Sequence, residues 1–219
     1  MNQKSRSSNI SNLSTSLICV LTSADIKFQR QERFIEYRNG IESAKKYFPN
    51  IEIEFLETRR YCCSSLETLG KVKYSRTHVP LLRNKGVLWV LALRWYLNEL
   101  KKTNPRVSHL LVMTGRYSLQ SEYFFEQIIK HASSDFVGKR LSLSGQVNTG
   151  LFYINLQLLE DWIKGYRYVK SELYSISVET SLMSFLLSKV DSGSVIQFVQ
   201  KLDLFMPVFG KGIRDFKIE

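Results

Sequence analysis

The chain has 219 residues, of which 44% are hydrophobic, so it is long and apolar enough to bury a core of its own. Low glycine and proline counts (11 and 4) exclude a low-complexity or collagen-like chain. The net charge of +11 favours an anionic partner, and the three classes that fit are nucleic acid, an anionic membrane and a phosphorylated small molecule. Because the cations are scattered and no zinc-finger, RNA-recognition or basic-zipper pattern occurs, we expect no specific nucleic-acid partner.

Three further features of the sequence bear on the compartment in which the protein works and on its domain organisation. Three cysteines, two of them adjacent, do not form a disulfide framework and indicate a reducing cytoplasm. The apolar run from Ser16 to Leu21 is much shorter than the ~20 residues of a membrane-spanning helix. Residues 1–15 are mostly Ser, Asn and Gln, which predicts a disordered leader before one domain at 16–219. We therefore expect a cytoplasmic protein.

Apolar runs and helical spacings alternate along the chain. Leu17–Leu21 predicts a buried strand that ends in a polar loop from Thr22 to Asp25. Apolar residues from Phe34 to Phe48 predict a helix, and alternation over 51–56 predicts a strand with one solvent-exposed face. The later predicted elements are a short helix at 64–69, a strand at 72–77, a buried helix at 87–100, a strand at 109–113, a helix at 121–131, an extended segment at 136–143, a polar loop at 145–149, a strand at 150–154, helices at 156–163 and around 178–186, and extended segments at 195–199 and 204–208. This alternation, with few hairpin signals, predicts an α/β fold: one mostly parallel sheet flanked by helices.

The most informative segment is Thr114-Gly115-Arg116-Tyr117, which ends the strand at 109–113. In α/β proteins, ligands bind just beyond the carboxyl ends of the strands. A glycine allows close backbone approach, an arginine forks onto phosphate, and a tyrosine covers a base or sugar face. The alternative for Arg116 is an ordinary surface arginine after a strand. By the same argument, Thr22 and Ser23 should lie near a bound nucleoside diphosphate.

A second cationic element is the predicted helix start Asn84-Lys85-Gly86. Free N–H groups and the helix dipole favour an anion at this place, and Lys85 would add a point charge. The glycine spacing of a P-loop is absent. The alternative is a plain helix cap with no ligand.

Carboxylates at element ends are the candidate bases. Glu179 lies at the start of the last predicted helix, where it either acts as a general base or only complements the helix dipole. Glu57, at the end of a predicted strand, has the same ambiguity. The three histidines are scattered, and no Asp-x-Asp occurs, so we see no metal-ligand motif.

The order of these short patterns resembles a group of bacterial and viral glycosyltransferases with the GT-A fold, associated with lipopolysaccharide or capsule assembly. The resemblance extends over residues 17 to 212. The patterns that carry it are Arg33 with Tyr37, Asn84-Lys85-Gly86, Thr114-Gly115-Arg116-Tyr117, Thr149-Gly150-Leu151-Phe152-Tyr153, the acid-bearing helix start Ser177-Val178-Glu179, and Gly210-Lys211-Gly212.

The resemblance implies a Rossmann-like nucleotide-sugar fold and transfer of a sugar from a nucleotide-sugar donor to a surface glycan or lipid-linked acceptor. Glu179 would be the catalytic base. The residues expected to bind the donor are Thr22, Ser23, Arg33, Glu57, Asn84, Lys85, Gly86, Thr114, Gly115, Arg116, Tyr117 and Gly150.

The chain departs from many GT-A enzymes in one respect. They hold a divalent cation with Asp-x-Asp, which is absent here, so the cofactor is not assigned. Arg116 and Lys85 would then stabilise the leaving diphosphate. A non-catalytic module that binds a nucleotide sugar or a polyanion is the alternative function. The basic composition also suits a peripheral position on the anionic inner face of a membrane.

Overall fold

The structure is a computed structural model. It describes residues 16–23, 30–58, 64–75, 84–141, 145–168, 170–171, 176–206 and 216–218. The expected leader at 1–15 and the glycine-containing segment at 210–212 lie outside these residues.

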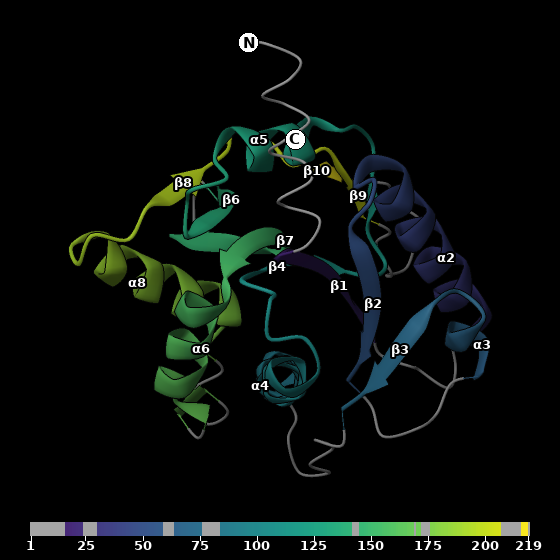
Figure 1. Ribbon diagram of the computed structural model, residues 1–219, viewed down its shortest axis with the longest axis horizontal. Coiled ribbons are helices and arrows are strands. Elements are labelled where there is room, and N and C mark those ends of the chain that lie inside the picture. Colours follow the sequence, from purple (N-terminus) through teal and green to yellow (C-terminus); the bar gives the residue numbers. More distant parts are fainter. Residues whose placement is uncertain are drawn as a thin grey trace.

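A seven-stranded sheet forms the centre of the molecule, with strand order β3-β2-β1-β4-β7-β6-β8 (Figure 1). Its strands are β1 (Leu17–Ser23), β2 (Glu52–Glu57), β3 (Lys71–Tyr74), β4 (His109–Thr114), β6 (Phe136–Leu141), β7 (Gln146–Asn155) and β8 (Ile196–Phe198). The strands from β3 to β4 are mutually parallel, β7 is antiparallel to both of its neighbours, and β8 is parallel to β6. The sheet is therefore mostly parallel, as predicted. Strands such as β1, which has a continuous apolar run, suit a parallel sheet because such a sheet buries both of its faces.

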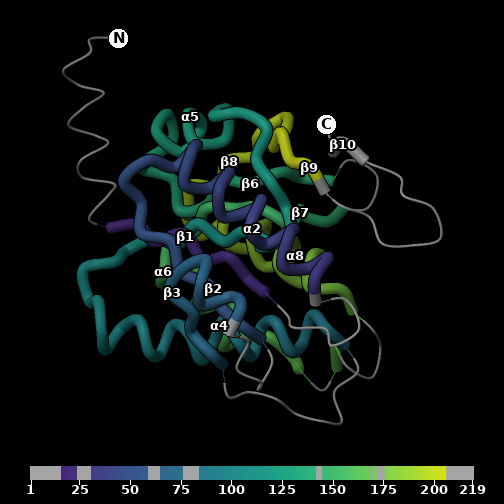
Figure 2. The backbone as a smooth tube through the Cα atoms, turned by 90° about the vertical axis from the view of Figure 1, so that its right-hand side faces the viewer, coloured from purple at the N-terminus to yellow at the C-terminus, as the bar shows by residue number. Residues whose placement is uncertain are grey.

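Helices cover both faces of the sheet, and Figure 2 shows α2 in front of it and α4 beneath it. One face carries α2 (Arg30–Tyr47), α3 (Ser64–Glu67) and α5 (Tyr123–Lys130). The other carries α4 (Lys85–Thr103), α6 (Leu156–Gly165) and α8 (Val178–Val190). A small second sheet has the order β10-β9-β5, from β5 (Ser118–Leu119), β9 (Leu204–Met206) and β10 (Phe216–Ile218). The two hydrophobic cores thus lie on opposite faces of one sheet, which is the predicted α/β class.

The central helix α4 is less completely buried than its composition predicted. Its inner side, including Leu93 and Tyr96, is buried, whereas Arg94 and Asn98 are exposed. The Tyr96 hydroxyl donates to Glu54 Oε2 at 2.7 Å, and Glu54 also forms an ion pair with Lys71. The prediction of a solvent-exposed face on β2 is therefore wrong at Glu54, because α4 covers that face and supplies the carboxylate with a hydrogen bond.

Three predicted loops or boundaries are wrong. The segment 145–149 belongs largely to β7, since the amide of Gln146 donates to hydroxyls of α8 and the Asn148 side chain accepts from a β7 backbone N–H. Thr22 and Ser23 continue β1 as buried residues rather than forming a loop. Leu119 lies in β5, and the helix that follows begins only at Tyr123. In each case polar residues have partners from distant parts of the chain.

Candidate functional site

The carboxyl ends of β1 and β4 lie side by side and lead to the predicted Thr114–Tyr117 segment. Thr22 pairs with Thr114 in the sheet register. The Gly115 N–H donates to the Thr22 carbonyl at 2.9 Å, and the Tyr117 N–H closes a turn on the Thr114 carbonyl, also at 2.9 Å. The structure therefore brings these four predicted residues together at one end of the sheet, beyond the carboxyl ends of parallel strands.

Helix α2 rests directly on this turn at Gly40. A Cβ atom on Gly40 would lie 2.2 Å from the Gly115 carbonyl oxygen, so no larger residue fits without moving the helix. Glu36 and Arg33 precede Gly40 by four and seven residues and hence share its helix face. Glu36 and Arg33 therefore lie on the face of α2 that packs against the segment carrying Arg116.

These charged groups interact in a mostly buried setting. Arg33 Nη1 lies 3.9 Å from Glu36 Oε2, and the two side chains are only 13% and 11% exposed. Burial raises the pKa of Glu36, against the opposing influence of Arg33 and then Arg116. Burial and the Arg116 charge both lower the pKa of Arg33. Sequence reasoning missed Glu36, although its three-residue spacing from Arg33 was a usable signal.

Tyr117 packs on β7 at Gly150. A Cβ atom on Gly150 would lie 2.4 Å from Tyr117 Cε2, so the absence of a side chain allows the ring to lie against the strand. Burial raises the pKa of the Tyr117 hydroxyl, while Arg116 lowers it and Glu179 raises it. Tyr117 is therefore within electrostatic range of both the predicted phosphate ligand and the predicted base.

Glu179 lies in the first turn of α8 and is fixed to β7. Thr149 Oγ1 donates to Glu179 Oε1 at 3.0 Å. The amide of Gln146 donates to Ser177 Oγ at 3.2 Å and to Thr180 Oγ1 at 3.1 Å, which ties the start of the helix to the same strand. Among the residues that the structure describes, nothing donates to Glu179 Oε2. One carboxylate oxygen is thus anchored, and the other can accept a proton.

The predicted helix start at 84–86 is partly a structural cap. Asn84 Oδ1 accepts from the N–H groups of Gly86 and Val87, at 2.9 and 3.4 Å, so Asn84 caps the helix, and donor binding by it stays a prediction. Gly86 lies against the side chain of Val178, next to Glu179. Lys85 is exposed, and its contact with a ligand stays a prediction.

Ser23 and Glu57 lie deeper than a ligand contact requires. Glu57 is fully buried and Ser23 is 3% exposed, and the Ser23 hydroxyl donates to Glu57 Oε2 at 3.1 Å. Both residues lie at the carboxyl ends of their strands, as predicted. Their side chains interact with each other, and donor binding by them stays a prediction.

The described residues do not fit a bound metal ion. No three His, Cys, Asp or Glu side chains within the described ranges gather as ligands for one ion. No described helix is both long and apolar enough to cross a membrane.

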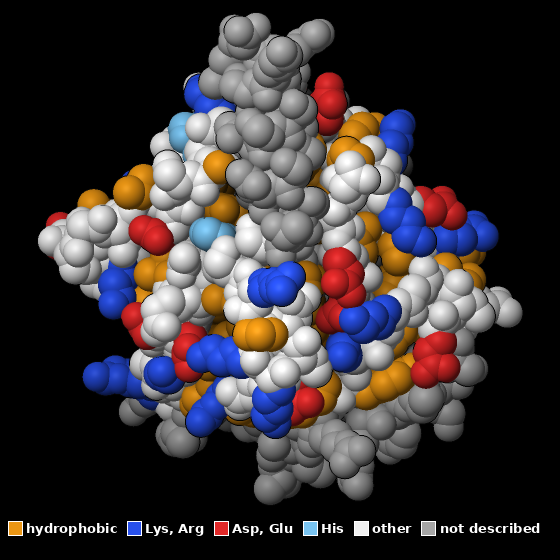
Figure 3. All heavy atoms as spheres, viewed as in Figure 1, with side chains coloured by type: hydrophobic (Ala, Val, Ile, Leu, Met, Phe, Trp, Pro, Cys, Tyr) orange, Lys and Arg blue, Asp and Glu red, His pale blue; other side chains and the backbone are white. Residues whose placement is uncertain are grey.

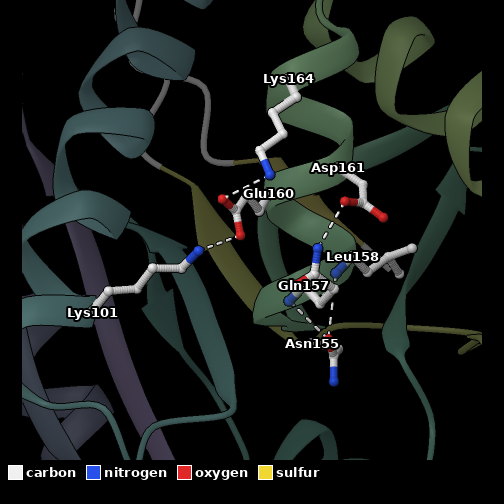
Figure 4. A network of polar contacts seen from close by, with 7 residues as sticks. All are labelled: Lys101, Asn155, Gln157, Leu158, Glu160, Asp161 and Lys164. Carbon is white, nitrogen blue, oxygen red and sulfur yellow. Dashed lines mark hydrogen bonds and ion pairs between the residues drawn. The ribbon is translucent and has the colours of Figure 1, made fainter.

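A separate pocket of about 320 Å³ lies at the opposite end of β4, between the end of α4 and the start of α6. Its charges are paired, because Lys101 and Lys164 both bond to Glu160, as Figure 4 shows. The Asn155 side chain caps α6 by accepting from Gln157 N–H at 2.9 Å. On the face seen in Figure 3, Lys and Arg are mixed with Asp and Glu rather than forming a block of one sign.

The fold is shared with solved structures of other proteins. The chain matches no protein-family model and no curated protein. It is similar to 4-diphosphocytidyl-2C-methyl-D-erythritol synthase from Anaerococcus prevotii, with a TM-score of 0.53, 14% identity and coverage of 88% of each chain. A cytidylyltransferase from Leptospira borgpetersenii has a TM-score of 0.54 and 11% identity, over 86% of this chain and 78% of that one. A glycosyltransferase involved in glycosylation of the PBCV-1 major capsid has a TM-score of 0.46 and 10% identity, over 83% and 81%. At these identities, the first two likenesses show only that the chain shares their Rossmann-like α/β fold.

Proposed function

We propose that this protein is a glycosyltransferase that moves a sugar from a nucleotide-sugar donor to a glycan or lipid-linked acceptor. The observation that carries the proposal is the placement of Glu179. Its carboxylate is anchored by Thr149 and lies within electrostatic range of Tyr117, which is adjacent to Arg116. A carboxylate and a guanidinium group thus both act electrostatically on one tyrosine, and transfer from a diphosphate to a hydroxyl requires a base and a phosphate-binding cation near each other.

The donor's diphosphate would bind at the turn after β4. Arg116 and Arg33 supply guanidinium groups, which bind phosphate with two parallel hydrogen bonds, and exposed Lys85 adds a third cation. Gly115 is held against β1 by its N–H bond to Thr22, so the turn is preorganised. Fixed positive charge of this kind stabilises the negative charge that develops on a leaving diphosphate.

Glu179 would take the acceptor's proton. The acceptor hydroxyl oxygen attacks the anomeric carbon of the donor, and the bond from that carbon to the diphosphate oxygen breaks. The leaving nucleoside diphosphate keeps the electron pair and remains paired with Arg116, while the hydroxyl proton passes to Glu179 Oε2. General-base assistance of this kind contributes ~10²–10⁴ in rate.

Nucleotidyl transfer is the second candidate, because the two neighbours with TM-scores above 0.5 are a cytidylyltransferase and a diphosphocytidyl-methylerythritol synthase. The two reactions release different products. Glycosyl transfer or donor hydrolysis releases nucleoside diphosphate from a nucleotide sugar, whereas nucleotidyl transfer releases pyrophosphate from a nucleoside triphosphate. Incubation with panels of nucleotide sugars and triphosphates, with and without manganese, therefore distinguishes them. Nucleoside diphosphate binding without release of either product would identify the non-catalytic module.

The acceptor proposal includes a peripheral position at an anionic membrane, supported by the net charge of +11. Co-sedimentation with vesicles tests it. Binding to vesicles rich in anionic lipid, weakening as salt rises, with no binding to neutral vesicles, is the expected result. Equal binding to both vesicle types would contradict it.

A further inference from the structure

Among the residues that the structure describes, Glu36 is an acid on which both arginines of the site, Arg33 and Arg116, act electrostatically. The 3.9 Å separation from Arg33 Nη1 is a charge contact, too long for a hydrogen bond. Glu36 Oε2 is buried and accepts no hydrogen bond from the residues that the structure describes. A buried carboxylate oxygen without a donor is costly, so this arrangement is not optimised for the stability of the fold.

The position of Glu36 is fixed by the helix that carries it. Gly40 seats α2 against the Gly115 carbonyl, and Glu36 lies one helical turn before Gly40 on the same face. The carboxylate is thus held within the fields of Arg33 and Arg116, both of which act on its pKa. Within these three described side chains, two guanidinium groups act on one carboxylate.

We infer that Arg33, Glu36 and Arg116 form a phosphate subsite in which Glu36 is the resident counter-ion that a phosphate group of the donor replaces. This inference rests on the proposed function, which places the donor's diphosphate at Arg116. A phosphate with two negative charges compensates both guanidinium groups and can form hydrogen bonds that Glu36 does not make. The carboxylate repels the incoming phosphate in a partly buried setting, where charges interact more strongly than in water. Glu36 therefore weakens phosphate binding, and it gives the empty site a counter-charge.

Calorimetric titration with inorganic pyrophosphate tests the inference without any sugar. Glu36→Gln keeps the shape of the side chain and removes its charge, so pyrophosphate should bind roughly ten-fold more tightly than to the wild type. Glu32→Gln is the matched control, because it removes the same charge from an exposed position on the same helix. The control should change the affinity by less than about two-fold, since exposed charges are screened.

A second pair of variants protects the test against a folding artefact. In an Arg116→Ala background, the gain from Glu36→Gln should shrink, because half of the positive charge that the phosphate and Glu36 compete for is gone. Weaker or unchanged pyrophosphate binding by folded Glu36→Gln protein would overturn the inference. If Glu36→Gln binds pyrophosphate more tightly but the protein transfers no sugar, the phosphate subsite is supported and only the proposed function is wrong. If the wild type transfers sugar normally but Glu36→Gln does not change the affinity for pyrophosphate, the phosphate-subsite inference is wrong and the proposed function stands.

Discussion

Two carboxylates at opposite ends of the sheet each lie beside two cations, yet their pKa values shift in opposite directions. At the amino end, hydrogen bonds from Lys101 and Lys164 lower the pKa of Glu160. At the carboxyl end, burial raises the pKa of Glu36 in spite of Arg33 and Arg116. The difference lies in hydrogen bonding and solvent access: Glu160 is bonded to partly exposed lysines, whereas Glu36 Oε2 has no donor among the described residues. Hydrogen bonds satisfy the Glu160 carboxylate, whereas one oxygen of the Glu36 carboxylate accepts none from the described residues.

The largest expected effect is at Glu179, which belongs to the carboxyl end. Glu179→Gln keeps size and polarity but removes the base, so turnover should fall by ~10²–10⁴ while donor affinity changes little. Steady-state kinetics together with calorimetry measure both quantities. If Glu179 only complements the dipole of α8, the variant will instead show near-normal turnover and a stability loss of at most ~1 kcal/mol.

The next effect tests whether the two ends belong to one cooperative unit. Leu93, on α4, is fully buried in the core that underlies both ends. Leu93→Ala should lower the free energy of unfolding by ~2–5 kcal/mol, because it leaves a cavity beneath the sheet. Chemical denaturation followed by tryptophan fluorescence measures it. An unresolvable change in the denaturation midpoint would show that α4 is peripheral.

A matched pair of charge deletions compares the ends directly. Arg116→Ala should weaken nucleoside diphosphate binding by ~1.5–3 kcal/mol, the range for a hydrogen bond to a charged group. Lys164→Ala removes the same charge at the amino end, where Lys164 is paired with Glu160 at 3.0 Å, and should leave the affinity nearly unchanged. Equal losses in the two folded variants would show that only the overall charge attracts the ligand.

The smallest effect concerns stability and pH. The lowered pKa of Glu160 means that its contribution is present above the unfolded value of about 4.3 and is lost as pH falls through the folded value. Glu160→Gln should therefore cost up to ~1 kcal/mol at pH 7 and less in acid. Glu36, with a raised pKa, favours the fold when it is protonated, so Glu36→Gln should not destabilise at pH 7. Denaturation of both variants at pH 7 and pH 4 checks the opposite signs, and a loss at pH 7 in both would contradict the comparison.

Several features could be predicted from the sequence because they depend on local patterns. The apolar run before Thr114-Gly115-Arg116-Tyr117 correctly predicted that this segment follows a strand. The helical spacing of apolar residues correctly predicted α2 and α4. Asn84 was foreseen as a possible cap, since the side-chain acceptor of a cap bonds to the first N–H groups of the helix that follows it. The parallel part of the sheet followed from the alternation of elements.

What the tertiary structure decided involves partners far apart in the chain. Nothing in the sequence around Gly40 predicts its contact with Gly115. Arg116 influences the pKa of Glu36 only because α2 packs beside the segment that carries Arg116. The polar segment 145–149 forms a strand because α8, some thirty residues later, satisfies Gln146 and because Thr149 finds Glu179. Local propensity depends on residues that are neighbours in the sequence. The burial and pairing of a charge depend instead on the elements that pack around it, and those contacts exist only in the folded chain.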